Sequence, residues 1–174
     1  MIDWKKDYLS SWNHPHRQLL VDVVKGYGRN VGSICELGCA SAPNLVKFAK
    51  EMPGLQLGGA DPVPEAIDMA KKVLPGAIFD VRSADNLYFA DNSVDVTLTD
   101  MTCIYLSPFV IKKALREMKR ITRSFVVLCE FYHPSMLMRE ALRFTSGYHA
   151  YDYPKLLEKA GFYDVKVYKI PLGS

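Results

Sequence analysis

The chain has 174 residues, a formal net charge of +3 at pH 7 and 49% hydrophobic residues, an ordinary globular composition that excludes disordered and fibrous classes. The charge is too small to indicate a nucleic-acid-binding protein, and no apolar run approaches the roughly 18 residues that a membrane-spanning helix needs. The polar N-terminus is not typical of a signal peptide, so we expect a cytoplasmic protein without a membrane partner.

Helical and strand patterns alternate along the chain. An amphipathic helix is predicted first, over residues 14–28. Strands are predicted over residues 33–38, 55–61, 77–83, 94–100, 124–131 and 163–170. Further helices are predicted over residues 43–51, 64–74, 111–123, 135–144 and 153–161. This alternation predicts an α/β fold with a doubly wound, mostly parallel sheet and helices on both faces.

The length fits a single domain over residues 1–174. Residues 31–174 carry the alternating pattern and form the predicted core. Residues 1–30 contain the aromatic side chains Trp4, Tyr8 and Trp12 and are predicted to form an N-terminal cap or lid. A helix packed on the edge of the sheet would also account for these aromatic residues.

The cysteines and histidines do not indicate a metal site or disulfides. The four cysteines lack CxxC spacing, and reduced thiols are expected. They are Cys35, Cys39, Cys103 and Cys129. His14 and His16 supply two ligands at most, and no grouping of acidic residues and histidines elsewhere points to the others, so we expect no metal.

The predicted helix at residues 111–123 concentrates positive charge outside its apolar stripe. Its cations are Lys112, Lys113, Arg116, Lys119, Arg120 and Arg123. A solvated helix face explains such a pattern best, and a surface that contacts phosphate is the alternative.

Ligands of doubly wound sheets bind beyond the carboxyl ends of the strands, where the strand order reverses. The first predicted strand ends in the segment 36–42, and the second ends at Asp61. The third ends in the segment 82–85, and the fourth ends at Asp100. Acidic side chains therefore stand at the ends of several strands. Each could be a helix cap or a solvated charge by itself, but together they favour a ligand site.

The turn after the first strand carries one glycine, Gly38, where a dinucleotide-binding turn carries three. Those glycines let bare backbone approach a pyrophosphate, so their absence favours a ligand that has none. S-adenosylmethionine is such a ligand. Glu36, Asp61 and the segment 83–85 stand where its amino group, ribose and adenine would need partners.

The segments ICELGCASAPN, LGGADPVPEAIDMAKK, SADNLYFADNSVDVTLTD and LLEKAGFYDVKVYKI resemble, in this order, the successive motifs of class I S-adenosylmethionine-dependent methyltransferases. The similarity is strongest to the small-molecule branch and covers roughly residues 30–170. It implies a Rossmann-like fold, S-adenosylmethionine as cofactor and a small-molecule acceptor as partner.

The resemblance also implies roles for individual residues. The turn and Glu36 would hold the methionine portion, and Asp61 would accept the ribose hydroxyls. Pro62 or Val63 would pack on the adenine. The full set of implied cofactor-binding residues is Tyr8, Arg17, Glu36, Gly38, Cys39, Ala40, Asn44, Asp61, Pro62, Ser83, Ala84, Asp85, Asp100 and Met101.

Two departures from the family pattern stand out. Ser83 precedes Ala84 where the family usually has an acidic residue, so either Ser83 or Asp85 would contact the adenine. Ala40 and Ala42 replace glycines in the turn. The backbone must therefore avoid positive φ there or hold the two alanines under slight strain.

Methyl transfer needs positioning more than a fixed set of catalytic groups. Tyr105 after the fourth strand and His133 after the fifth are the candidates for a catalytic role, with His133 able to act as a general base. A surface histidine at a helix start is the simpler reading of His133. The segment DMTCIYL lacks the Asn/Asp-Pro-Pro-aromatic signature of enzymes that methylate nucleic-acid amines, so a nucleic-acid acceptor is not expected.

The family typically ends in two antiparallel strands, whereas residues 163–170 are followed here only by PLGS. A shortened antiparallel edge is therefore expected, which favours a homodimer through that edge or a covering by the N-terminal segment. Two other functions stay open: a catalytically silent module that binds S-adenosylmethionine or a partner, and an NAD(P)-dependent oxidoreductase. The missing glycines count against the oxidoreductase.

Overall fold

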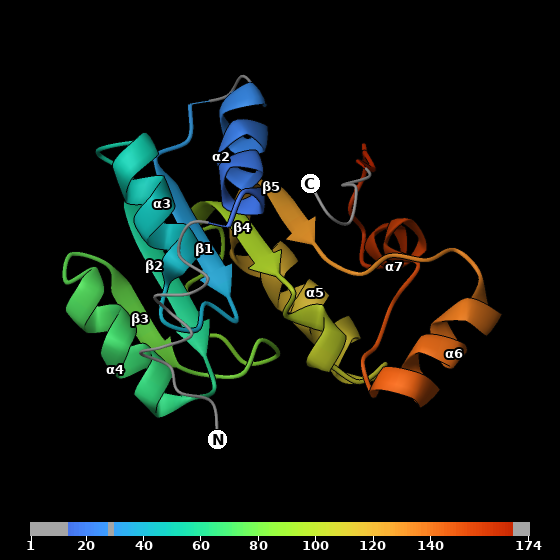
Figure 1. The fold of residues 1–174 in the computed structure, drawn as a ribbon. Coiled ribbons are helices and arrows are strands. Elements are labelled where there is room, and N and C mark those ends of the chain that lie inside the picture. The colour runs from blue at the N-terminus through green and yellow to red at the C-terminus, as the bar shows by residue number, and fades with distance from the viewer. Residues whose placement is uncertain (1–13, 28–29, 169–174) are drawn as a thin grey trace.

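The computed structural model describes residues 14–27 and 30–168, and it has one five-stranded sheet between two layers of helices (Figure 1). The strands are β1 (Ser33–Leu37), β2 (Gln56–Asp61), β3 (Ile78–Val81), β4 (Val94–Asp100) and β5 (Thr122–Cys129). All neighbouring pairs are parallel, in the order β3-β2-β1-β4-β5. The predicted doubly wound α/β fold is therefore confirmed.

The helices follow the predicted positions closely. They are α2 (His16–Gly26), α3 (Pro43–Glu51), α4 (Pro64–Val73), α5 (Val110–Ile121), α6 (Met136–Ser146) and α7 (Tyr153–Lys159), with a short 3-10 helix, η1 (Cys103–Tyr105), after β4. Pro43 and Pro64 stand in the first turns of α3 and α4, where a missing N–H costs nothing. No helix in the described part of the chain has the length and apolar character that crossing a membrane requires.

The sheet has an apolar core on each face. Helices α2, α3 and α4 cover one face and bury side chains such as Leu20, Phe48 and Ile67. Helices α5 and α7 contribute Leu115 and Leu157 to the core of the other face. Strand β1 contributes side chains to both cores, because alternate side chains of a strand point to opposite faces of the sheet. This double coverage explains why β1 is buried along its whole length.

Strand β1 lies between β2 and β4, so the strand order reverses at β1. In the register of the sheet, Leu37 of β1 pairs with Ala60 of β2 and Thr99 of β4. The residues that follow these three positions therefore meet at one edge of the sheet. This places Asp61, Asp100 and the turn after β1 in one neighbourhood.

The C-terminal strand predicted over residues 163–170 is wrong for the part that the structure describes. Residues 163–168 form no strand, and Asp164 has a φ of 56°. A left-handed residue interrupts an extended chain, and β-propensity cannot make a strand without a paired neighbour. Among the described residues β5 is consequently an edge strand, and no antiparallel strand accompanies it.

Candidate functional site

The turn after β1 has an unusual backbone conformation. Gly38, Ala40 and Ala42 have positive φ angles of 68°, 46° and 66°. The Gly38 amide donates a 2.7 Å hydrogen bond to the carbonyl of Ala60 on β2, which ties the turn to the sheet. A left-handed conformation costs an alanine about 1–2 kcal/mol. Of the two alternatives that the sequence left open, the strained turn is therefore the correct one.

We expect Ala40→Gly to raise the free energy of unfolding by about 0.5–1 kcal/mol, because relief of strain exceeds the entropy that glycine adds to the unfolded chain. Ala42→Gly is the matched control. The Ala42 methyl group is fully buried, and its loss removes about 0.8 kcal/mol of that gain. Urea denaturation of both variants measures the difference, and a destabilised Ala40→Gly protein would contradict the argument.

Asp61 ends β2, and its carboxylate joins the turn to the start of α4. Oδ2 accepts the amide N–H of Ala40 at 3.0 Å, and Oδ1 accepts that of Val63 at 2.9 Å. Burial raises the pKa of Asp61, and the two backbone N–H groups partly offset the rise. Each carboxylate oxygen can accept a further hydrogen bond. The side chain is therefore fixed in place with acceptor capacity to spare.

Five polar side chains from α2, α3, β1 and β4 form what we call the carboxylate cluster: His16, Arg17, Glu36, Asn44 and Asp100. The Asn44 amide nitrogen donates to Glu36 Oε1 at 2.6 Å and to Asp100 Oδ2 at 3.0 Å. His16 Nε2 lies 2.7 Å from that same oxygen of Asp100. The Arg17 guanidinium donates to Asn44 Oδ1 and lies 3.6 Å from Asp100. Helix α2 thus contributes two of the five side chains, His16 and Arg17, to the cluster.

The two carboxyl groups of the cluster differ in their electrostatics. Glu36 is 2% exposed, and burial raises its pKa well above the ordinary value. Burial opposes ionisation of Asp100 as well, but hydrogen bonds from His16 and Asn44 outweigh it and lower the pKa. Two nearby carboxyl groups with pKa values shifted in opposite directions are typical of functional sites.

Each of these carboxyl groups also has one buried oxygen that finds no hydrogen-bond partner among the described residues, namely Glu36 Oε2 and Asp100 Oδ1. A buried acceptor left unpaired costs about 1–3 kcal/mol, and more when the group is charged. Because Asn44 bridges the two carboxyl groups, both oxygens belong to the same small region. A cationic group with several N–H donors would satisfy both of them.

Thr102 and Glu130 are part of this site, although the sequence did not predict them as functional residues. The Thr102 hydroxyl donates to the carbonyl of Leu37 at 3.1 Å, so it braces the turn after β1. Glu130 Oε1 accepts the amides of Thr102 at 3.0 Å and Cys103 at 3.1 Å. Nothing in the sequence marks Thr102. Glu130 follows the end of a strand, which is the signal that identified Glu36 and Asp61.

Glu130 should make stability depend on pH. Its carboxyl group is buried, although the residue is partly exposed, and burial raises its pKa from 4.5 to about 7 against the hydrogen bonds from Cys103 and Thr102. The unfolded carboxyl group ionises first, so the protein loses roughly 3 kcal/mol as the pH rises through that window. Glu130→Gln cannot ionise and keeps an acceptor for both amides. In urea denaturation, we expect the free energy of unfolding of Glu130→Gln, relative to that of the wild type, to rise by roughly 3 kcal/mol across this pH window. A difference between the two proteins that does not change with pH would contradict the raised pKa of Glu130.

The residues proposed for the adenine lie at the end of β3. Ser83 Oγ donates to Asp85 Oδ1 at 2.6 Å, and this pair is exposed, whereas Ala84 is buried. The geometry does not choose between Ser83 and Asp85. Pro62 is exposed beside Asp61.

The other predicted cofactor-binding residues have mainly structural contacts. The Cys39 amide donates to Ala60, and its side chain is buried against the glycine backbone of β2. Met101 has a φ of 53° and donates its amide to Cys129 on β5. Tyr8, together with Trp4 and Trp12, lies outside the described residues.

The two candidate catalytic residues are not joined to the carboxylate cluster by any hydrogen bond within the described residues. His133 Nδ1 accepts the amide of Ser135 at 3.1 Å, which is the contact of a histidine at a helix start. Tyr105 is 69% exposed and packs edge-on against Tyr148, with ring centroids 5.5 Å apart. Both follow strands whose ends face the candidate site.

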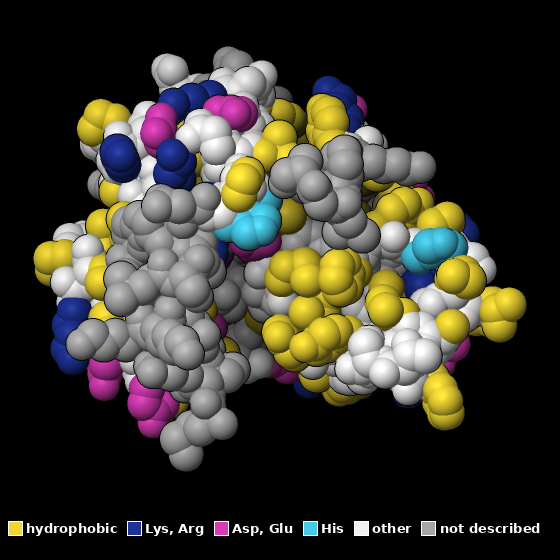
Figure 2. Space-filling view, in the orientation of Figure 1, with side chains coloured by type: hydrophobic (Ala, Val, Ile, Leu, Met, Phe, Trp, Pro, Cys, Tyr) yellow, Lys and Arg dark blue, Asp and Glu magenta, His cyan; other side chains and the backbone are white. Residues whose placement is uncertain are grey.

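Apolar side chains gather on the face of the molecule where α5 and α6 lie (Figure 2). The large exposed ones on and near these helices include Tyr105, Phe109, Met136, Leu137, Met138 and Phe144. Helix α6 has no buried residue, so its apolar side chains are available for contact with another molecule. Exposed apolar patches of this kind mark binding surfaces more often than chance allows.

Several solved structures share this fold at low sequence identity. A candidate O-methyltransferase from Nostoc punctiforme has a TM-score of 0.78 and 17% identity, over 97% of this chain and 56% of that one. A candidate S-adenosylmethionine-dependent histamine N-methyltransferase from Thermotoga maritima has a TM-score of 0.68 and 20% identity, over 93% and 77%. A complex from Haloferax volcanii, between a methyltransferase activator and a candidate methyltransferase, has a TM-score of 0.70 and 19% identity. The match covers 91% of this chain and 72% of that one.

Sequence comparison gives the family. No curated protein matches the chain. The family model described as a methyltransferase domain matches residues 34–124. These residues include nearly all of β1, strands β2 to β4, the turn after β1, Asp61 and most of the carboxylate cluster. The match covers more than half of the 174 residues. With the fold and the site geometry in agreement, the chain belongs to the methyltransferase-domain family.

Proposed function

We propose that the protein is an S-adenosylmethionine-dependent methyltransferase with a small-molecule acceptor. The observation that carries the proposal is the pair of unpaired buried oxygens, Glu36 Oε2 and Asp100 Oδ1. The methionine ammonium of S-adenosylmethionine is a cation with three N–H donors, which is the chemistry that these oxygens need. A dinucleotide carries no ammonium group to donate to these oxygens.

The remaining parts of the site fit the same cofactor. Asp61 has acceptor capacity beyond its bonds to Ala40 and Val63, and two ribose hydroxyls would use it. Arg17 would hold the cofactor carboxylate from α2, and Ser83 or Asp85 would reach the adenine from β3. When bound, S-adenosylmethionine supplies an electrophilic methyl group on a sulfonium.

In this proposal the chain contributes mainly position and exclusion of water. The bonds of Thr102 to Leu37 and of Glu130 to Thr102 fix the segment after β4 against the turn after β1. His133 would take a proton from an acceptor that must lose one, and Tyr105 would line the acceptor side. The exposed apolar face around Tyr105 favours an acceptor with an apolar body.

A thermal-shift measurement with S-adenosylhomocysteine tests cofactor binding. This demethylated analogue of the cofactor, at a hundred times its dissociation constant, should add about 2.7 kcal/mol of stability. NAD at the same concentration is the matched control and should add nothing. Stabilisation by NAD alone would refute the proposal. Binding of the analogue without turnover of any acceptor would instead identify a catalytically silent binding module.

A further inference from the structure

Helix α5 carries five cations, and Arg123 at the start of β5 adds a sixth. Lys113 lies over the ring of Phe109, and three of the others have structural partners. Lys119 donates to the carbonyl of Gly161, Arg120 pairs with Glu117 and Asp91, and Arg123 pairs with Asp95. The contacts of Lys119 with Gly161 and of Arg120 with Asp91 tie α5 to neighbouring loops, and the pair of Arg123 with Asp95 joins β5 to β4. These three cations therefore stabilise the fold.

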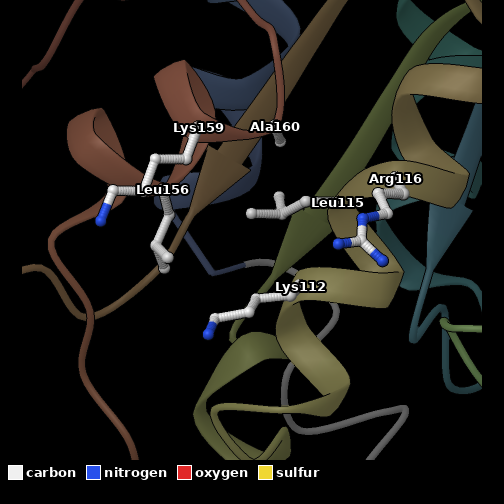
Figure 3. Close-up of a pocket in the computed structure, with 6 residues that line it drawn as sticks. All are labelled: Lys112, Leu115, Arg116, Leu156, Lys159 and Ala160. Atoms are coloured by element: carbon white, nitrogen blue, oxygen red, sulfur yellow. The ribbon is translucent and has the colours of Figure 1, made fainter.

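Two further cations of α5 and one of α7 surround a hollow of about 220 Å³ between these helices (Figure 3). Lys112 and Arg116 come from α5, and Lys159 comes from α7. None of the three pairs with a carboxylate in the described ranges, and no acidic residue lines the hollow. Its apolar lining consists of Leu115, Leu156 and Ala160, with Leu115 and Leu156 extending into the space between the helices.

This arrangement has a cost that a ligand could remove. Like charges four residues apart on a helix, such as Lys112 and Arg116, destabilise it, and Lys159 adds a third positive charge across the hollow. An anion would reverse the repulsion. The hollow is smaller than the roughly 300–1,000 Å³ of pockets that enclose whole small molecules. It has room for a single apolar side chain.

We propose that the hollow between α5 and α7 binds an acidic segment of a partner protein that inserts one apolar side chain against Leu156 and Ala160. Carboxylates on either side of that anchor pair with Lys112, Arg116 and Lys159. Apolar anchoring gives affinity and the surrounding charges give orientation, as in other interfaces. None of the lining residues belongs to the carboxylate cluster, so the inference does not rest on the proposed methyl transfer.

The test uses the full-length protein and a short fluorescent peptide of Glu and Asp around one central Phe. Fluorescence anisotropy at low salt measures its affinity. The variant Lys112→Gln, Arg116→Gln, Lys159→Gln should bind at least about tenfold more weakly. This variant removes mutual repulsion, so it should fold, and thermal denaturation checks that it does. Replacing the peptide Phe with Ser should also weaken binding about tenfold or more.

The matched control removes the same charge elsewhere. Lys50, Lys71 and Lys72 are exposed on α3 and α4, and their triple Gln variant should bind the peptide as the wild type does. An equal loss in this control would show nonspecific attraction and overturn the proposal. Equal affinity for the Phe and Ser peptides would overturn it as well, as would the absence of binding by either peptide.

Discussion

Replacing Asp61 with alanine is expected to weaken binding of S-adenosylhomocysteine by about 100-fold or more. Hydrogen bonds to a charged group contribute about 1.5–3 kcal/mol each, and two ribose hydroxyls would lose theirs together. The same change removes the acceptor for the amides of Ala40 and Val63, so the turn would also lose its support. Isothermal titration calorimetry with the purified variant gives the affinity.

Asp68 provides the matched control, because it is an exposed carboxylate on the neighbouring helix α4. Asp68→Ala changes the net charge equally and should leave the affinity as it is. Asp61→Asn keeps an acceptor oxygen but loses the charge, and we expect an intermediate loss. Circular dichroism establishes that each variant is folded. Unchanged affinity in folded Asp61→Ala protein would remove Asp61 from the cofactor site.

Gly38→Ala is expected to destabilise the protein by about 3 kcal/mol. The backbone at Gly38 has a φ of 68°, which alone costs an alanine about 1–2 kcal/mol. A Cβ atom at this position would lie 2.8 Å from Cβ of Thr102, well inside contact distance, and crowding of this kind costs about 1–3 kcal/mol. Thr102 is held by Leu37 and Glu130, so it cannot move aside easily. Urea denaturation measures the loss.

A double-mutant cycle separates the two causes of that loss. Thr102→Gly removes the overlapping side chain, so Gly38→Ala in that background should show only the cost of the backbone angle, about 1–2 kcal/mol. A loss that is the same in both backgrounds would show that the overlap with Thr102 contributes nothing. The cycle therefore tests whether the segment after β4 packs on the turn as the structure has it.

A shared fold does not establish a shared function, so the function must be argued from the site. The solved structures described above are less than 25% identical to the chain, and they therefore show its fold only. The features that favour S-adenosylmethionine here are the acceptors at the ends of β1, β2 and β4, and these belong to the part of the chain that the family model matches. Helix α6 lies beyond that match, and its exposed apolar residues Met136, Leu137 and Phe144 give this chain its own surface.

The alternation of apolar and amphipathic segments determined the fold class. Strand β4 and helix α3 have the predicted bounds, because their apolar patterns are long and are bounded by proline, aspartate and turn residues. The acidic residues Glu36, Asp61 and Asp100 could be placed at one edge of the sheet for a related reason. A parallel sheet brings the carboxyl ends of its strands together whatever the loops do.

Contacts between distant segments were decided only by the tertiary structure. No local pattern shows that His16 and Arg17 meet Asp100, or that Asn44 bridges two carboxyl groups, since these residues come from separate elements. The left-handed angles of Ala40 and Ala42 likewise run against local preference, and residues 163–168 do not form the strand that their β-propensity predicted. Propensity and periodicity act over a few neighbouring residues. Hydrogen bonds between side chains, backbone strain and edge pairing depend instead on which elements the whole fold brings into contact.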